Sequence, residues 1–178
     1  MTVAFAVPDV LVARAQAGDE AAFEALFRAF ETPVYNLVRR ILRRPEDAED
    51  VVQETFLEVV RNIKQYRGEG HLWGWIRRIA STKALMRIRR DQVRATEPLD
   101  EEPGKLGGPT FVGANIDLER AFEQLSETSR AVVWLHDVEG YTHEEIAEQM
   151  GKSVSFSKSQ LARAHARLRR MLDEGARA

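Results

Sequence analysis

The sequence predicts an all-α protein in which two small helical domains are joined by a flexible linker. Apolar residues recur every three to four positions along most of the chain, and strand-like alternation is nearly absent. A stretch rich in proline and glycine interrupts this pattern a little past the middle of the chain. The composition, 44% hydrophobic and 30% charged among 178 residues, is typical of soluble helical proteins.

The first domain, residues 1–91, is expected to contain four helices. Each apolar stripe follows a residue that can cap a helix, a proline that suits its first turn, or a glycine-rich loop. The expected signals are Asp9 for a helix over 10–17 that ends at Gly18, Asp19 for a helix that continues past Pro33, Pro45 for a third helix, and "RGEG" (67–70) before a fourth helix that begins near Leu72 and ends in "MRIRRD".

Residues 92–116 are expected to form an acidic flexible linker, because they contain three prolines and four glycines and show no helical period. Helical periodicity resumes at Asp117, and Ser126 can cap a further helix. The second domain is therefore expected to span residues 117–178.

The segment "YTHEEIAEQMGKSVSFSKSQL" (141–161) predicts a helix-turn-helix. Thr142 and Glu145 have the spacing of a capping box, Gly151 suits a left-handed turn, and Ser153 can cap the second helix. That helix is expected to turn Leu161, Ala164, Leu168 and Leu172 inward and to leave Lys158, Ser159, Gln160 and Arg163 pointing outward, where they can reach the major groove of DNA. An ordinary helical hairpin with a solvated face is the alternative that this segment leaves open.

Three features of the first domain also bear on function. The third helix carries an acidic ridge that is either solvated or docks a basic partner helix, and the run Arg77–Arg90 can follow a phosphate backbone. Aromatic residues surround the "RGEG" loop, where they can stack on unpaired bases. Among them, Trp75 is expected in the core and Trp73 on the surface. The ridge contains Asp47, Asp50, Glu54 and Glu58, with Gln53 beside them.

Several classes of function have little support in the sequence. The chain has no cysteine, which excludes disulfides and cysteine-based zinc sites and agrees with a cytoplasmic location. The N-terminus lacks the features of a signal peptide, and no apolar stretch is long enough to span a bilayer. His143 stands beside Glu144, but the second histidine of a metalloprotease motif is missing and His71, His136 and His165 are scattered. No enzymatic activity, metal or cofactor is expected.

Together, "DAEDVVQETFLEVV", "YRGEGHLWGWIRRIA", the linker and "DVEGYTHEEIAEQMGKSVSFSKSQLARAHARLRR" resemble a bacterial RNA polymerase sigma factor of the extracytoplasmic-function (ECF) group of the sigma-70 family. The resemblance covers nearly the whole chain in the expected order. It implies that the chain binds core RNA polymerase, recognises a promoter and helps to open it. The first domain would act at the −10 element as sigma region 2, and the second at the −35 element as region 4.

The resemblance also implies which residues act. The acidic helix would dock on the clamp helices of the largest polymerase subunit, and the loop after it would take up a flipped base of the −10 element. The next helix would hold the upstream edge of that element, and the linker would run through the RNA channel. The implied residues are Asp47, Asp50, Gln53 and Glu54 for polymerase, Arg67, Gly68, His71, Trp73, Arg77, Arg78 and Lys83 for the −10 element, and Ser155, Lys158, Ser159, Gln160 and Arg163 for the −35 element.

The chain departs from the family pattern at both DNA-reading surfaces. Thr82 stands where the family usually has Asn, and Met86 lies near a usual Asp, which leaves the −10 preference open. The recognition helix reads "SFSKSQ" (155–160) in place of Gly-Thr-Val-Lys-Ser-Arg, so that Ser157 replaces a buried Val and Phe156 can swing in to fill part of its space. We therefore expect an atypical −35 sequence.

Two further possibilities stay open. One is a stand-alone helix-turn-helix regulator whose first domain serves for dimerisation or sensing and which binds duplex DNA without polymerase. The other concerns the regulation of a sigma factor. The family resemblance implies an anti-sigma factor that covers the polymerase-binding surfaces, and phosphorylation near Thr55 or Thr82 is equally possible.

Overall fold

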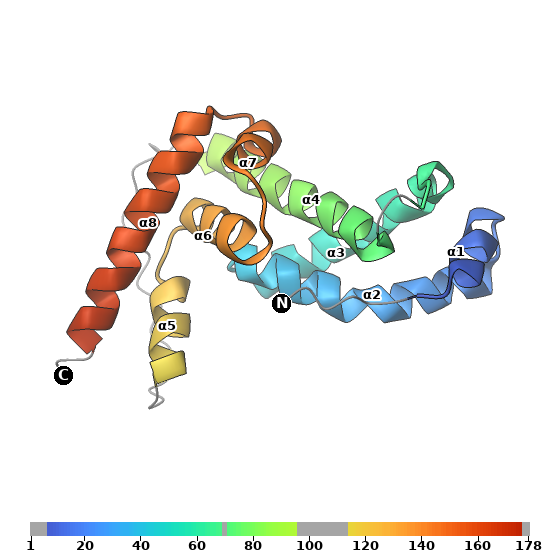
Figure 1. Ribbon diagram of the computed structural model, residues 1–178, viewed down its shortest axis with the longest axis horizontal. Coiled ribbons are helices and arrows are strands. Elements are labelled where there is room, and N and C mark those ends of the chain that lie inside the picture. Colours follow the sequence, from blue (N-terminus) through green and yellow to red (C-terminus); the bar gives the residue numbers. More distant parts are fainter. Residues whose placement is uncertain (1–6, 69–70, 96–113, 176–178) are drawn as a thin grey trace. The chain divides into compact units, whose positions relative to one another are not determined.

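The computed structural model describes residues 7–68, 71–95 and 114–175 (Figure 1). All the regular elements within these ranges are helical, so the predicted all-α fold is confirmed. The chain divides into two compact units, residues 1–87 and 88–178, and the division falls inside the helix α4 (Leu72–Ala95). None of the helices in the described ranges combines the length and the apolar character needed to cross a lipid bilayer.

The first unit contains α1 (Asp9–Gln16), α2 (Glu20–Ile41), α3 (Pro45–Asn62), the 3-10 turn η1 (Ile63–Gln65) and the beginning of α4. Two of its start signals act as expected. The side chain of Asp19 accepts a hydrogen bond from the backbone N–H of Ala22 at 3.1 Å, a cap that stabilises a helix by about 1 kcal/mol. Pro45 is the first residue of α3, where its missing N–H costs nothing.

The expected cap at Asp9 is wrong. Pro8 precedes the helix and Asp9 is its first residue, so the carboxylate lies in the first turn, where a negative charge favours the helix dipole. By contrast, α2 continues through Pro33 as expected, and Val34 and Leu37 beyond it are fully or almost fully buried.

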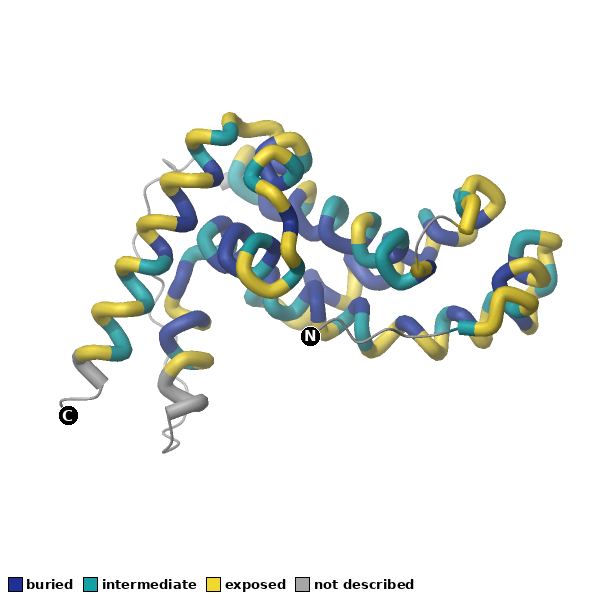
Figure 2. Tube along the Cα trace, in the orientation of Figure 1, coloured by how far each residue is buried: buried dark blue, intermediate teal, exposed yellow. Residues whose placement is uncertain are grey.

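The core of the first unit forms where the apolar stripes of α2, α3 and α4 meet, visible as dark blue bands along these helices (Figure 2). The spacing of the buried residues follows the helical period, which is why the stripes could be read from the sequence. They include Leu26, Phe30, Ile41, Leu42, Val51, Phe56 and Ile76.

The boundaries of the linker differ from those expected. Helix α4 continues to Ala95, because "QVRA" contains no helix breaker, and α5 (Ala114–Glu123) begins before Asp117. The remaining part of the expected linker, residues 96–113, lies outside the described residues, as do Glu69 and Gly70 of the "RGEG" loop.

The second unit contains α5, α6 (Glu127–Val133), a π-helical turn η2 (Trp134–Val138), α7 (His143–Met150) and the long α8 (Val154–Gly175). Ser126 caps α6 as expected, accepting from the N–H of Ser129 at 3.3 Å. Helix α8 contacts α5, α6 and α7 (Figure 1). Leu161 and Ala164 of α8 are buried as expected, whereas Leu168 and Leu172 are only half-buried.

Candidate nucleic-acid and protein interfaces

The acidic ridge of α3 has two parts: a margin whose carboxylates bond side chains of α4, and an exposed face. In the margin, Oδ1 of Asp47 accepts a hydrogen bond from Nη2 of Arg87 at 2.5 Å, and these side chains are only 12% and 21% exposed. Glu58 accepts from Nζ of Lys83 at 3.2 Å, and this hydrogen bond holds the pKa of Glu58 below its ordinary value. Both carboxylates therefore tie α3 to α4, and Asp47 is buried rather than on an exposed ridge as expected.

The exposed face of α3 carries apolar as well as acidic side chains. Asp50 is 60% exposed, with Oδ2 at 3.5 Å from Nη1 of Arg87, and Gln53 is also exposed. Leu57 and Val60 are 56% and 50% exposed. Leu57 was not singled out in the sequence, although it stands two helical turns after Asp50 and so shares its face.

The loop that follows α3 is anchored by a residue that sequence reasoning missed. The side-chain amide of Gln16, at the end of α1, donates to the carbonyl of Ile63 at 3.0 Å and to that of Tyr66 at 2.8 Å. Gly68 has φ of 76°, a left-handed conformation that favours glycine. Between these anchors and α4, the expected site residues Arg67, Gly68 and His71 are all exposed.

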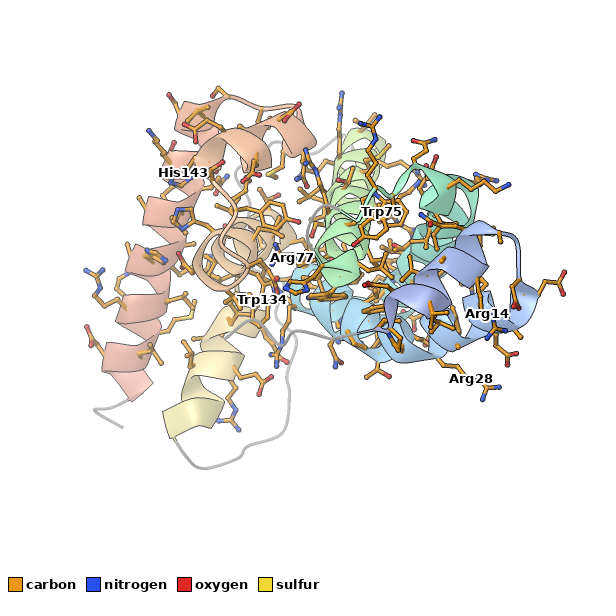
Figure 3. The ribbon with its side chains drawn as sticks, turned by 45° about the vertical axis from the view of Figure 1, so that its right-hand side comes forward. Arg14, Arg28, Trp75, Arg77, Trp134 and His143 are labelled. Carbon is orange, nitrogen blue, oxygen red and sulfur yellow. The ribbon has the colours of Figure 1, made fainter. Side chains whose placement is uncertain are left out.

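The aromatic residues beside this loop pack differently from the prediction. Trp73 is half-buried and stacks on Phe30, with ring centroids 6.0 Å apart and planes 6° apart. Trp75, expected in the core, is also only half-buried and packs against Tyr66 at 5.7 Å (Trp75 is labelled in Figure 3). The ring next to the exposed loop is therefore that of Trp75 together with Tyr66.

The basic residues of α4 fall into two groups. Arg78 is exposed, whereas Arg77 is half-buried and its Nε is buried. Lys83 and Arg87 face α3, where they bond the carboxylates of Glu58 and Asp47. Lys83, expected at the −10 element, has only 24% of its side chain exposed and bonds Glu58 at 3.2 Å.

The two threonines considered for phosphorylation differ in access. Thr55 is fully buried, and its hydroxyl donates to the carbonyl of Val51 at 2.7 Å, so a kinase could not reach it in the folded unit. Thr82 is half-exposed and donates to the carbonyl of Arg78 at 2.9 Å.

The second unit contains the expected helix-turn-helix. In the capping box, the Thr142 hydroxyl accepts from the N–H of Glu145 at 3.2 Å, and the Glu145 carboxylate accepts from the N–H of Thr142 at 2.9 Å. Gly151 has φ of 62° and turns the chain between the helices. The hydroxyl of Ser153 then caps α8 by accepting from the N–H of Phe156 at 3.1 Å.

The outer face of α8 combines cations with small side chains. Ser155, Lys158, Ser159 and Arg163 are exposed as expected, and Ala162, which was not singled out, lies among them. Small residues allow a helix to approach base edges closely, and an alanine methyl can contact thymine. Nζ of Lys152, in the turn, lies 5.7 Å from the ring centre of Phe156 and adds a further exposed cation.

Gln160 does not belong to this face. It is only 8% exposed, and its Oε1 lies 3.4 Å from the hydroxyl of Ser129 on α6. The expectation that Gln160 points outward is therefore wrong. Ser157 is fully buried as expected of a Val replacement, but its hydroxyl contacts His143 at 3.0 Å, whereas Phe156 is half-buried under Lys152.

Three histidines that stand far apart in the sequence, His136, His143 and His165, lie together in the second unit. His136 and His143 stack with ring centroids 4.4 Å apart, and Asp137 bonds both His136 at 2.8 Å and His165 at 2.6 Å. Among the residues that the structure describes, no group of acidic and histidine side chains is arranged to hold a metal ion.

Both units match known protein families. Residues 26–94 match the family described as Sigma-70 region 2, and residues 116–168 match the family described as Sigma-70, region 4. The chain is 33% identical to the ECF RNA polymerase sigma factor SigM of Mycobacterium tuberculosis, over 91% of this chain and 83% of that protein. It is 31% identical to the ECF RNA polymerase sigma-E factor of Escherichia coli K12, over 87% of this chain and 88% of that protein.

The fold is also that of a solved sigma factor. The structure of RpoE in complex with the anti-sigma factor NepR from Bartonella quintana matches with a TM-score of 0.55 and 20% identity, over 85% of this chain and 96% of that chain. A stand-alone helix-turn-helix regulator is not favoured, because the first unit matches sigma region 2 as well. The chain belongs to the ECF group of the sigma-70 family, the sigma factors that bind core RNA polymerase and direct initiation at specific promoters.

Proposed function

We propose that the exposed face of α3 is the surface that docks on the clamp helices of the largest polymerase subunit. It presents Asp50 and Gln53 with Leu57 and Val60, and Glu54 lies half-buried at its edge. Exposed apolar side chains rimmed by polar ones are typical of protein interfaces. In this assignment Leu57 supplies the apolar contact, Asp50 and Glu54 attract a basic helix, and Asp47 holds α3 to α4.

At the −10 element, the loop of Arg67, Gly68 and His71 takes up an extruded base. The half-buried pair Tyr66 and Trp75 beside this loop offers an aromatic surface for stacking. Burial raises the pKa of Tyr66, with a smaller contribution from Asp9, so its phenol stays neutral. Capturing the base offsets the unstacking cost of a few kcal/mol, which favours strand opening.

On α4 the residues that contact the backbone of the −10 element are Arg77 and Arg78. Trp73, implied by the family resemblance, supports the loop by stacking on Phe30 and has only part of its surface free for a base. Lys83 acts mainly as the partner of Glu58.

At the −35 element, α8 enters the major groove with Ser155, Lys158, Ser159 and Arg163, and Ala162 lies at the same surface. Gln160 serves the packing of α8 on α6. This surface lacks a residue that pairs bidentately with adenine, which supports the expectation of an atypical −35 sequence.

The rest of the function follows from this division. Region 2 spans residues 1–91 and region 4 residues 117–178. The acidic tether between them passes through the RNA channel of polymerase. It was expected at residues 92–116, and α4 extends to Ala95. The protein acts in the cytoplasm, where its polymerase acts, and it needs no catalytic residue and no cofactor. An anti-sigma factor covers its polymerase-binding surface, and the solved complex of RpoE, which has a similar fold, with the anti-sigma factor NepR supports the existence of such a partner.

The observation that carries the proposal is that α3 and α8 each present an exposed face of the kind its partner requires. The experiment is run-off transcription with purified core RNA polymerase on a library of promoters with random −10 and −35 segments. We expect promoter-specific transcripts that need both core polymerase and this chain, from a −35 sequence other than the common AAC-containing motif. Equal duplex binding with and without core polymerase in a gel shift would contradict the proposal.

A further inference from the structure

The histidine cluster lies where the two helices of the helix-turn-helix meet. His143 is the first residue of α7, and its Nδ1 is 3.0 Å from the hydroxyl of Ser157, which is fully buried in the first turns of α8 (His143 is labelled in Figure 3). Because a buried hydroxyl without a partner is costly, this bond fixes the depth at which α8 sits on α7. Because Ser157 precedes Lys158 in the chain, the position of Ser157 on α7 also sets how far the proposed DNA-contacting face of α8 projects from α7.

The other side of the His143 ring is occupied by a second histidine. The ring of His136 stacks on it at 4.4 Å with planes 22° apart. His136 is held there by Asp137, whose Oδ1 contacts its Nδ1 at 2.8 Å, and Oδ2 of Asp137 contacts Nε2 of His165 on α8 at 2.6 Å. The wide π-helical turn η2 thus links α6, α7 and α8 through titratable side chains.

The charged groups around His143 are mixed in sign: His136 and Lys158 disfavour a proton on this ring, and Glu144 and Asp137 favour one. From η2 it faces His136 and Asp137, from α8 it faces Lys158, and from its own helix it faces Glu144. The ring of His136 lies with its centroid 4.4 Å from that of His143, and this neighbour lowers the pKa of His143. The one acidic neighbour on η2 is already shared between His136 and His165.

We propose that His143 is a positioning residue for the recognition helix and that it seats α8 on α7 only as a neutral imidazole. Acidification then loosens the helix-turn-helix and weakens contact with the −35 duplex. The effect on α8 follows from the cluster alone, whereas the effect on DNA rests on the proposed function of α8.

The direction of the pH dependence follows from linkage. Burial, His136 and Lys158 lower the pKa of His143 below its ordinary 6.5, against the smaller opposing influence of Glu144 and Asp137. An opened helix-turn-helix therefore binds a proton more readily than the closed one. The closed form has its full stability above pH 6.5 and loses stability as the pH falls from there through the lowered pKa.

The test is hydrogen exchange of the full chain, followed by mass spectrometry from about pH 8 to about pH 5, the range in which histidine titrates. The exchange rates are corrected for the intrinsic pH dependence of amide exchange. The opening constant of residues 151–163 should rise in acid, by about tenfold for each pH unit by which the His143 pKa, read from its ring NMR signals, lies below its unfolded value. An NMR pKa of His143 at or above the unfolded value would overturn the proposal in the wild-type chain, whatever the variants do.

Two matched variants separate His143 from the rest of the cluster. In His143→Gln the amide can still bond Ser157 but cannot take a proton, so protection at high pH should stay within about twofold of wild type and should not fall in acid. His165→Gln leaves His143 in place and should keep the acid response. Loss of the response in His165→Gln but not in His143→Gln would assign it to another group and refute the proposal.

The consequence for DNA is measured separately. Holoenzyme made with wild type or His143→Gln is tested on one promoter selected by run-off transcription at about pH 7.5, and open-complex formation is compared at about pH 7.5 and about pH 6, on either side of the histidine range. The ratio of wild type to variant should fall in acid. A ratio that stays constant refutes the effect on DNA, whereas failure of the wild type to give promoter-specific transcripts at the higher pH would refute the proposed function and leave the exchange result standing.

Discussion

Replacing Asp47 with asparagine should destabilise the first unit and leave its affinity for core polymerase unchanged. The Asp47 side chain is 12% exposed and its partner Arg87 21% exposed, with 2.5 Å between Oδ1 and Nη2. Removing one partner of a fully buried ion pair costs about 3–5 kcal/mol, and an exposed pair contributes about 0–1 kcal/mol. The Asp47–Arg87 pair lies between these limits.

The neighbouring carboxylate of Asp50 limits the expected loss of stability. In Asp47→Asn, Arg87 keeps Asp50 at 3.5 Å as an acidic partner, so part of its charge stays compensated. We therefore expect a loss of about 2 kcal/mol in the free energy of unfolding, which lowers the melting temperature of a unit of this size by about 10 °C. Asp50→Asn is the matched control: its side chain is 60% exposed, and its loss should be below about 1 kcal/mol.

The assay is urea denaturation of both variants followed by circular dichroism, together with a titration of labelled chain with core polymerase. Equal stability of Asp47→Asn and wild type, combined with weaker polymerase binding, would refute the reasoning. That result would mean that Asp47 acts on the docking surface and that its bond with Arg87 contributes little.

Three further predictions concern single contacts. Thr142→Ala should lower the stability of the second unit by about 1 kcal/mol in chemical denaturation, because it removes half of the capping box; no loss would mean that the box does not hold α7. The hydrogen bond from Lys83 lowers the pKa of Glu58, so the stability that this pair adds is present above pH 4.5 and is lost as the pH falls below it. Denaturation curves of Glu58→Gln at two pH values should therefore show a smaller loss of stability in acid than those of wild type. An equal loss would mean that the Glu58–Lys83 pair does not contribute to stability. Gln160→Leu should leave the affinity for the selected −35 duplex within about twofold of wild type, because the side chain is interior, and a tenfold loss in a gel shift with holoenzyme would return Gln160 to the DNA surface.

The features that could be predicted from the sequence depend on residues a few positions apart. A cap such as Asp19, the box of Thr142 and Glu145, and the left-handed Gly151 each need only neighbours along the chain. The order of the family motifs then added the function, which no single helix reveals.

Pairings between distant residues could not be predicted. Asp47 and Arg87 are separated by two helix boundaries, so the sequence showed a ridge of charge but not which carboxylates face α4. The histidines of the second unit lie on η2, α7 and α8, and no spacing rule signals the π-helical turn that carries His136.

One error had a usable signal. Gln160 stands three positions after the buried Ser157 and four before the buried Ala164, so the helical period places it on the inner face. Gln160 was nevertheless expected on the outer face, because its side chain is polar and it lies in the family motif.

The central claim is that the exposed face of α3 grips polymerase independently of the DNA-reading helix α8. The most direct measurement is the affinity of core polymerase for Asp50→Lys/Glu54→Lys, beside Glu31→Lys at an exposed position of α2 and Arg163→Ala on α8, with circular dichroism to confirm folding. The account predicts a loss of about tenfold or more for the double variant and values within about twofold of wild type for the other two. Normal binding by a folded double variant, or an equal loss in Glu31→Lys or Arg163→Ala, would contradict it.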